Sequence, residues 1–368
     1  MSLQTEITKG ASEISTDGYA MSIGELMNLY RDNELDLHPE FQRFYRWTLP
    51  QKSRLIESIL LGIPLPSIFV FQRGDGIWDV VDGLQRLGTI FEFAGVLRDE
   101  NRKLFPPLNL LKTRYLPSLE GKVWINEDKP DRALTNVQRL IIKRAKLDIK
   151  IIKSDSSETS KYELFQRLNT GGTHASDQEV RNCLLIMNNR EMFKWFETLS
   201  KNPDFEKCAA LTDRQLEERY DMELVLRFMV LKDLRKDQLK FEDMGEFLTE
   251  EMLKLAGSNI FDYVRARNAF DKTFRLLVDS ELEDDAFRKF NLHHGRFMGS
   301  FALSAFEAVA VGLGHRFTVE PDWPVPASLS NTVKALWSNP EFTANSGSGI
   351  RANLRIPHIV PLGRNLFR

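Results

Sequence analysis

The feature that most constrains the fold of this chain is a strand-to-helix turn over residues 77–91. A short run rich in β-branched residues ends at Asp82, and Gly83 permits an abrupt change of direction. A helical pattern of apolar residues begins at once, with Leu84, Leu87, Ile90 and Phe91. The sequence therefore predicts that Gln85 and Arg86 lie at a corner between a strand and a helix.

Such a corner suits a phosphate group and a metal ion. The free N–H groups of a first helical turn favour an anion, and Arg86 can add a two-pronged phosphate contact. Asp82 can hold Mg²⁺, and Gln85 can orient a water molecule or a base edge. The alternative is a plain tight turn in which Asp82 caps the helix and Arg86 is a surface residue, and one short motif does not decide between the two.

Composition limits the possible function classes. The 368 residues have a net charge of -2 and a pI of about 6.4, so any nucleic-acid contact must come from local basic patches. The two cysteines, Cys183 and Cys208, form no zinc-ligand spacing, which favours a reducing cytoplasm. The sequence shows no secretory signal and no window that could span a bilayer, so a cytoplasmic protein is expected.

The predicted fold class is α+β, with a small mixed sheet followed by an all-helical domain. Strand patterns over 66–71, 77–82 and 147–151 alternate with helical patterns, and from 176 to 312 the periodicity is helical almost throughout. The predicted segments are a flexible leader (1–20), an α/β domain (21–175), a helical domain (176–340) and a tail with Gly, Ser and Arg (341–368).

Two further stretches carry possible binding residues. Residues 41–47 include Gln42, Arg43 and Trp47, a mixture that can stack a base and bind phosphate, or can form an irregular loop anchored in the core. Asn169, followed by Gly171 and Gly172, either lets the backbone approach a phosphate or simply ends a helix. Ser176 and Glu179 then predict the start of a helix that bears Arg181 and Asn182.

The remaining charged groups have structural explanations beside functional ones. The basic segment 143–153 predicts a solvated face or a polyanion contact, and the tail arginines fit a polyanion, a partner surface or disorder. The acidic residues around Arg219 predict an ion-paired helix face. We expect no metal site at His293 and His294, because neighbours on a helix point in different directions.

Three of these elements together resemble the N-terminal domain family of GmrSD-type, modification-dependent restriction proteins, of the wider ParB/sulfiredoxin-like superfamily. The family's Q-R-x-x-x-W, D-G-Q-Q-R and N-x-G-G…E-x-R-N elements correspond here to Gln42-Arg43 with Trp47, to Asp82–Arg86, and to Asn169–Gly172 with Glu179, Arg181 and Asn182. The resemblance covers about residues 20–185.

The resemblance implies a ParB-like sheet domain that handles a nucleotide with Mg²⁺ in defence against foreign DNA. Asp82, Gln85 and Arg86 would be catalytic, with Asp82 the metal ligand. The nucleotide would contact Gln42, Arg43, Trp47, Gly83, Asn169, Gly171, Gly172 and Arg181.

Two features depart from the family pattern. Leu84 replaces a family glutamine, which puts turnover in doubt. His358–Pro361 looks like the start of an HNH nuclease domain, but too few residues follow it for such a nuclease, so we expect a standalone form without that domain.

Three functions remain open from the sequence. The first is hydrolysis of a nucleoside triphosphate, the second is cleavage or nicking of DNA by the same residues, and the third is a non-enzymatic switch that controls a separate nuclease. Expected partners are a nucleoside triphosphate, DNA and an effector nuclease, and oligomerisation is compatible with all three.

Overall fold

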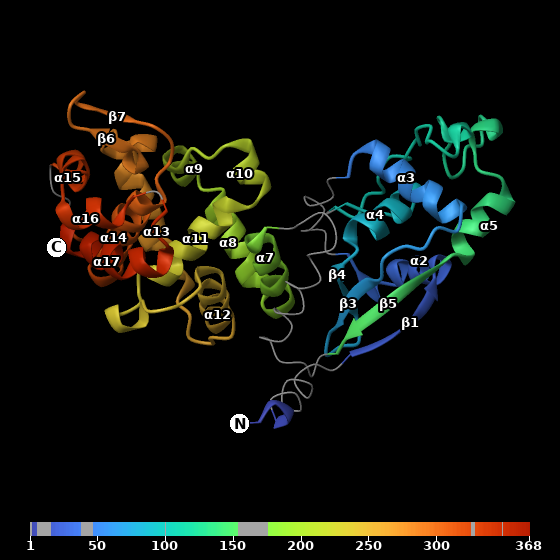
Figure 1. The fold of residues 1–368 in the computed structure, drawn as a ribbon, viewed down its shortest axis with the longest axis horizontal. Helices are drawn as coiled ribbons and strands as arrows, with labels where there is room; N and C mark the ends of the chain where they lie inside the picture. Colours follow the sequence, from blue (N-terminus) through green and yellow to red (C-terminus); the bar gives the residue numbers. More distant parts are fainter. Residues whose placement is uncertain are drawn as a thin grey trace. The chain divides into compact units, whose positions relative to one another are not determined.

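The structure is a computed structural model, and it describes residues 2–5, 16–37, 47–99, 101–153, 176–324, 328–347 and 349–368 (Figure 1). The chain divides into two compact units, residues 1–172 and 173–368. The sequence predicted this boundary between residues 175 and 176. Each unit buries apolar side chains of its own.

The first unit is built on a five-stranded mixed sheet with the order β1-β5-β3-β4-β2. Its strands are β1 (Thr16–Ser22), β2 (Leu35–Asp36), β3 (Ile68–Gln72), β4 (Trp78–Asp82) and β5 (Lys146–Ile152). β3 pairs antiparallel with β4 and parallel with β5, while β1 is antiparallel to β5 and β2 is parallel to β4. The strands predicted over 66–71 and 77–82 are confirmed as β3 and β4, and they form a hairpin.

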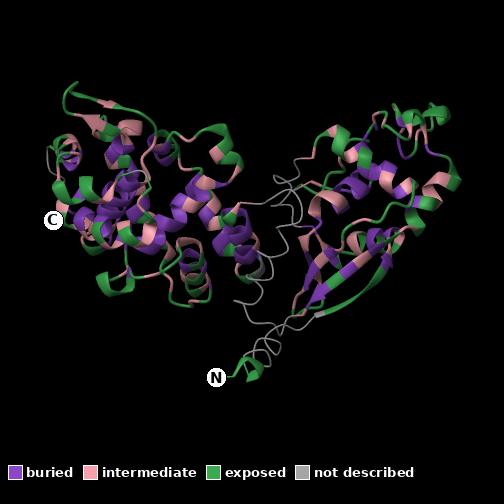
Figure 2. Cartoon of the chain, viewed as in Figure 1, coloured by how far each residue is buried: buried purple, intermediate pink, exposed green. Residues whose placement is uncertain are grey.

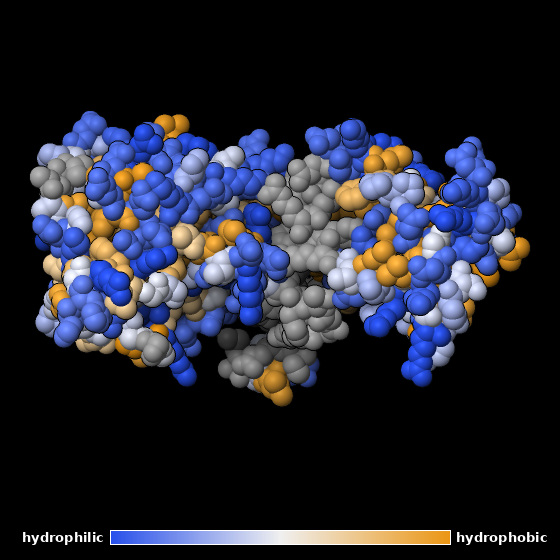
Figure 3. All heavy atoms as spheres, turned by 90° about the horizontal axis from the view of Figure 1, so that it is seen from above, coloured by the Kyte–Doolittle hydropathy of each residue, from blue (hydrophilic) through white to orange (hydrophobic). Residues whose placement is uncertain are grey.

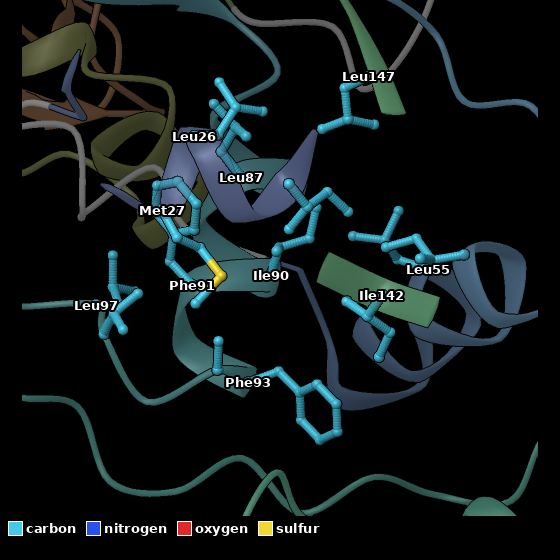
Figure 4. Packing of buried hydrophobic residues seen from close by; sticks show 14 of the residues in the cluster. Leu26, Met27, Leu55, Leu87, Ile90, Phe91, Phe93, Leu97, Ile142 and Leu147 are labelled. Atoms are coloured by element: carbon cyan, nitrogen blue, oxygen red, sulfur yellow. The ribbon is translucent and has the colours of Figure 1, made fainter. Parts of the chain in front are cut away.

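Four helices complete the hydrophobic core of this unit: α2 (Ile23–Arg31), α3 (Leu49–Leu60), α4 (Leu84–Phe93) and α5 (Asn136–Arg144). From Leu87 to Phe93 every residue of α4 is buried, and its side chains meet those of the other three helices and of β5 (Figure 4). Apolar area removed from water stabilises by about 25 cal/mol per Å², so this packing fixes α4 firmly. The corner before α4 is therefore held by a helix with little freedom to move.

The second unit consists mostly of helices. They are α7 (Asp177–Asn188), α8 (Arg190–Ser200), α9 (Pro203–Ala209), α10 (Asp213–Glu217), α11 (Tyr220–Leu231), α12 (Met244–Ala256), α13 (Tyr263–Asp279), α14 (Leu303–Val319), α15 (Leu329–Leu336), α16 (Pro340–Asn345) and α17 (Ala352–Leu366). α11 and α14 are buried on nearly all sides, as their apolar sequences require.

The expectation of an all-helical second domain is wrong at one place. β6 (Lys289–Asn291) and β7 (Arg296–Met298) form an antiparallel hairpin. His293 and His294 lie in its turn and not on a helix, and their backbone N–H groups donate to the side chain of Asn291. Among the described residues no three His, Cys, Asp or Glu side chains group as a metal site would require.

Both predicted terminal segments contain regular structure. Residues 16–20 of the expected leader belong to β1, because this strand completes its backbone hydrogen bonds against β5. The expected tail contains α16 and α17, and α17 buries Ile356, Ile359 and Val360. The stretch 358–361 that resembled the start of an HNH domain lies inside α17.

Buried residues lie in the interior of each unit and exposed ones on its outer loops and helix faces (Figure 2). Hydrophilic residues predominate on the face drawn in Figure 3, with hydrophobic residues scattered between them. In the part of the chain that the structure describes, no helix is long and apolar enough to cross a membrane.

Candidate functional site

The corner between β4 and α4 depends on a glycine. Gly83 is the residue that precedes α4, and its φ is 100°, a left-handed conformation that side chains other than glycine rarely adopt. A Cβ atom at this position would lie 2.2 Å from Cδ1 of Ile68. The backbone can therefore turn from Asp82 into α4 only because residue 83 has no side chain.

The first turn of α4 has no side-chain cap among the described residues. Asp82 does not cap the helix, and the Arg86 side chain is only 11% exposed. The plain-turn alternative required a capping Asp82 and a surface Arg86, so it is wrong on both points. The positive end of the α4 dipole therefore has no side-chain partner among the described residues, and such a helix start favours an anion.

Arg86 connects α4 to the segment before β3. Its Nη2 donates to Oδ2 of Asp82 at 3.0 Å, and its Nη1 donates to the carbonyl oxygens of Pro66 and of Ser67, the latter at 3.2 Å. Burial lowers the pKa of Arg86, although the neighbouring Asp82 acts to raise it. An arginine still stays protonated, so Arg86 is a largely enclosed cation that connects three parts of the fold.

Gln85 joins the corner to the end of the aromatic stretch. Its Oε1 accepts a hydrogen bond from the backbone N–H of Trp47 at 3.1 Å. The Trp47 side chain is partly buried and packs against the core of the first unit. Gln42 and Arg43 lie outside the described residues. The structure therefore brings Trp47 to Gln85 and places part of its ring against apolar residues.

Asp82 has the position and exposure that a metal ligand needs, but it is a single carboxylate. Its side chain is 42% exposed, and one oxygen binds Arg86. Mg²⁺ is often held by one or two carboxylates together with substrate phosphates and water. The site therefore fits Mg²⁺ only as a shared ligand of Asp82 and a bound phosphate.

The structure describes only the helical part of the third predicted element. Asn169, Gly171 and Gly172 lie outside the described residues. Arg181 is in α7 of the second unit, 1% exposed, where its Nε donates to Gln178 and its Nη2 to Glu223 at 2.7 Å. In the structure Arg181 thus has a packing role, because its side chain is enclosed by α7 and α11.

Two polar residues of the first unit were not singled out from the sequence. Asp79, in the middle of β4, is fully buried and lies 3.5 Å from Nε of Arg73. Glu57 of α3 accepts hydrogen bonds from the backbone N–H groups of Tyr115 and Leu116, at 2.8 and 3.1 Å. A carboxylate inside a β-branched run was the available signal for Asp79, whereas Glu57 looked like an ordinary helix residue.

Glu57 also borders the larger of two pockets that we describe, a space of about 690 Å³ between α3 and the segment 111–120. Burial by itself would raise the pKa of Glu57, but hydrogen bonds from Thr113, Tyr115 and Leu116 lower it below its usual value. Its carboxylate is therefore charged at neutral pH and holds this segment in place.

Comparison with protein families gave a match that covers most of the first unit. Residues 23–186 match the family described as GmrSD restriction endonuclease, N-terminal domain. A comparison with curated proteins and another with solved structures found no match. The matched range begins at α2 and includes the whole corner from Asp82 to Arg86. Residues 23–186 of this chain, just under half of its length, are therefore similar to the GmrSD restriction endonuclease N-terminal domain family.

Proposed function

We propose that this domain binds a nucleoside triphosphate with Mg²⁺ and hydrolyses it as a component of a restriction system. The family description supports the restriction system. The observation on which the nucleotide proposal rests is the start of α4, which lacks a side-chain cap in the described structure and has Asp82, Gln85 and Arg86 beside it. Helix N-termini after a glycine turn are favourable places for phosphate groups.

Each residue at the corner has a proposed task. The backbone N–H groups after Gly83 would bind a phosphate, and Gln85 would orient the attacking water. Arg86 would neutralise charge that develops on the phosphoryl oxygens. Bound Mg²⁺, shared by Asp82 and the phosphates, would supply positive charge at the same oxygens.

Further nucleotide contacts are proposed from the sequence alone. They are Gln42, Arg43, Trp47, Asn169, Gly171 and Gly172. Arg181 is left out of the proposal, because its guanidinium is enclosed within the second unit.

The contacts of Arg86 favour a second candidate, a nucleotide-controlled switch without turnover. Arg86 holds Pro66, Ser67 and Asp82 with three of its five N–H donors, so a phosphate that takes over any of these donors breaks a contact that holds the segment before β3. Mg²⁺ on Asp82 would compete with Arg86 for the same carboxylate. Nucleotide binding would then loosen the segment before β3, and a partner such as a separate effector nuclease could read that change.

The test is phosphate release from ATP, GTP, CTP and UTP with Mg²⁺, with and without DNA. We expect one triphosphate to be hydrolysed by the native chain and the rate to fall by roughly a hundredfold or more in Asp82→Asn and Gln85→Leu. Asp128→Asn removes the same charge from an exposed position of the same unit and should leave the rate unchanged. Thermal unfolding of each variant shows whether a lost rate reflects a lost fold.

Nucleotide affinity, measured by calorimetry with and without Mg²⁺, separates the candidates. Binding that Mg²⁺ strengthens in the native chain and not in Asp82→Asn would support the shared metal site even without turnover. Binding without hydrolysis would favour the switch. Cleavage of DNA with no triphosphate binding would favour a nuclease, and the absence of any binding at the corner would refute the proposal.

A further inference from the structure

A second pocket lies within the helical unit, far along the chain from the corner. It has a volume of about 300 Å³ and lies where α14 and α17 end, next to the short 3-10 turn η5 (Lys236–Gln238). Its polar lining consists mainly of cations and a histidine: Lys236, His315, Arg316, Arg364 and Arg368. Val319, Pro361 and Asn365 complete the lining, which includes no carboxylate.

The cations of this pocket are only partly neutralised by the described residues. Arg316 pairs with Glu320, whereas no ion pair is found for Lys236, Arg364 or Arg368 within the described parts of the chain. The Nε atoms of Arg316 and Arg364 are buried and have no hydrogen-bond partner there. Buried N–H donors of this kind normally find a partner, in the protein or in a ligand.

Part of the positive charge has a structural purpose. Arg364 donates to the carbonyl oxygen of Leu231 at 2.6 Å, and Nδ1 of His315 lies 2.8 Å from that of Lys232, so both side chains serve the end of α11. Each helix C-terminus is equivalent to about half a negative charge. The ends of α11, α14 and α17 and the carboxylate of Glu320 offset part of this charge, and Asp233, which pairs with Lys232, also interacts with Arg364.

We propose that this pocket binds a small anion that carries a phosphate group. Guanidinium groups match the oxygens of a phosphate in pairs, and Lys236 adds a flexible point charge at the rim. A volume of about 300 Å³ is at the lower end for small-molecule sites, so one phosphate or the phosphate of a nucleotide fits, with little room for a larger ligand. The site is independent of the corner at Asp82, because all its lining residues belong to the second unit.

Titration of the full chain with inorganic phosphate and pyrophosphate tests the proposal, with affinity read by calorimetry. The double variant Lys236→Gln/Arg368→Gln removes two exposed cations without a described contact, and we expect it to weaken the affinity roughly tenfold. Arg214→Gln removes an exposed cation elsewhere in the same unit, where it pairs with Glu218, and should change the affinity little. Hydrogen exchange at residues 315–320 and 361–368 should slow when phosphate binds.

Two further measurements identify the molecule that carries the phosphate and test whether binding is specific to this pocket. Tighter binding of a nucleoside monophosphate than of phosphate would identify a nucleotide as the ligand, and equal affinity would identify the free anion. Arg144→Gln removes an exposed cation of the first unit and should leave phosphate binding to this pocket unchanged. The proposal is wrong if phosphate does not bind, or if Arg214→Gln weakens binding as much as the double variant does.

Discussion

At the scale of single residues, the corner between β4 and α4 depends on a few contacts, and substitution of a single residue would disturb them. Gly83 provides the turn, Arg86 holds Asp82 and the segment before β3, and Gln85 holds the backbone of Trp47. The same residues that are proposed to handle phosphate therefore also hold the fold together. A loss of activity in a variant of these residues can therefore be assigned to the site only if the stability of the variant is also measured.

Gly83→Ala should destabilise the first unit by at least about 2 kcal/mol, because a left-handed conformation costs an alanine about 1–2 kcal/mol and the Cβ atom adds a clash with Ile68. Urea unfolding measures the change. Gly95→Ala is the matched control: its φ is also positive, at 70°, but its Cβ would meet nothing within 4 Å. Equal losses in the two variants would show that contact with Ile68 is unimportant.

Arg86→Ala should destabilise the first unit by about 2–3 kcal/mol, since the carbonyl oxygens of Pro66 and Ser67 lose their donor and Asp82 loses its ion pair. Arg144→Ala removes the same side chain from an exposed position at the end of α5 and should change the free energy of unfolding by less than about 0.5 kcal/mol. A stable Arg86→Ala protein would mean that these hydrogen bonds contribute little in solution.

At the scale of elements, α17 is where the sequence misled most. The Gly and Ser residues before it and the arginines at positions 351, 355, 364 and 368 suggested a flexible basic tail, although only Arg355 and Arg364 lie within the helix. In the structure Gly363 and Gly312 bring α17 and α14 together so closely that a Cβ on Gly363 would lie 2.1 Å from the carbonyl oxygen of Ala308. Packing against α14 outweighs the unfavourable local sequence, because the helix buries its apolar face there.

Gly363→Ala should therefore destabilise the second unit by about 1–3 kcal/mol, even though alanine is the better helix former. Thermal unfolding gives the comparison with Gly347→Ala, where the nearest atom to a new Cβ, on Ile350, is at an ordinary 3.6 Å. If Gly363→Ala were as stable as the native chain, α14 and α17 would have to pack less closely than described.

At the scale of the whole molecule, a buried chain of charges links four helices of the second unit. Glu223 of α11 binds Arg181 of α7 and Arg227 of its own helix, and Glu307 of α14 binds Arg227 and Arg355 of α17. Glu307 is fully buried. Removal of one member from such a network leaves a buried charge without compensation, which typically costs about 3–5 kcal/mol.

Stability of the second unit should fall in acid because of Glu223. Burial would raise the pKa of this carboxyl, but Arg227 and Arg181 lower it below its usual value of about 4.3. A lowered pKa in the folded state means that the stabilisation is complete above about pH 4.3 and is lost as the pH falls through the folded pKa. Urea unfolding at a series of pH values from 7 downward measures this loss.

Glu223→Gln should reduce stability at pH 7 by about 3 kcal/mol and also flatten the acid dependence. Glu218→Gln is the control, since Glu218 is an exposed partner of Arg214 and should contribute less than about 1 kcal/mol. An unchanged acid dependence in Glu223→Gln would assign the acid sensitivity to other carboxyl groups.

Local sequence patterns correctly predicted the features that depend on residues close together in the chain. The strands around residues 70 and 80, the turn at Gly83, and the helix start at Ser176 are confirmed, because each depends on residues within a few positions of one another. The short β6–β7 hairpin was missed because its strands have three residues each and little alternation.

The sequence by itself therefore determined that a strand meets a helix at Gly83 and that Asp82, Gln85 and Arg86 stand at that corner. Only the tertiary structure decided where their side chains go: Arg86 to Pro66 and Ser67, and Gln85 to Trp47. It also placed α17, a helix with one buried face, in the stretch expected to be a tail. The physical reason is that a buried polar group or apolar face pairs with the partner that folding brings close to it, and that partner can be 20 or 133 positions away in the chain.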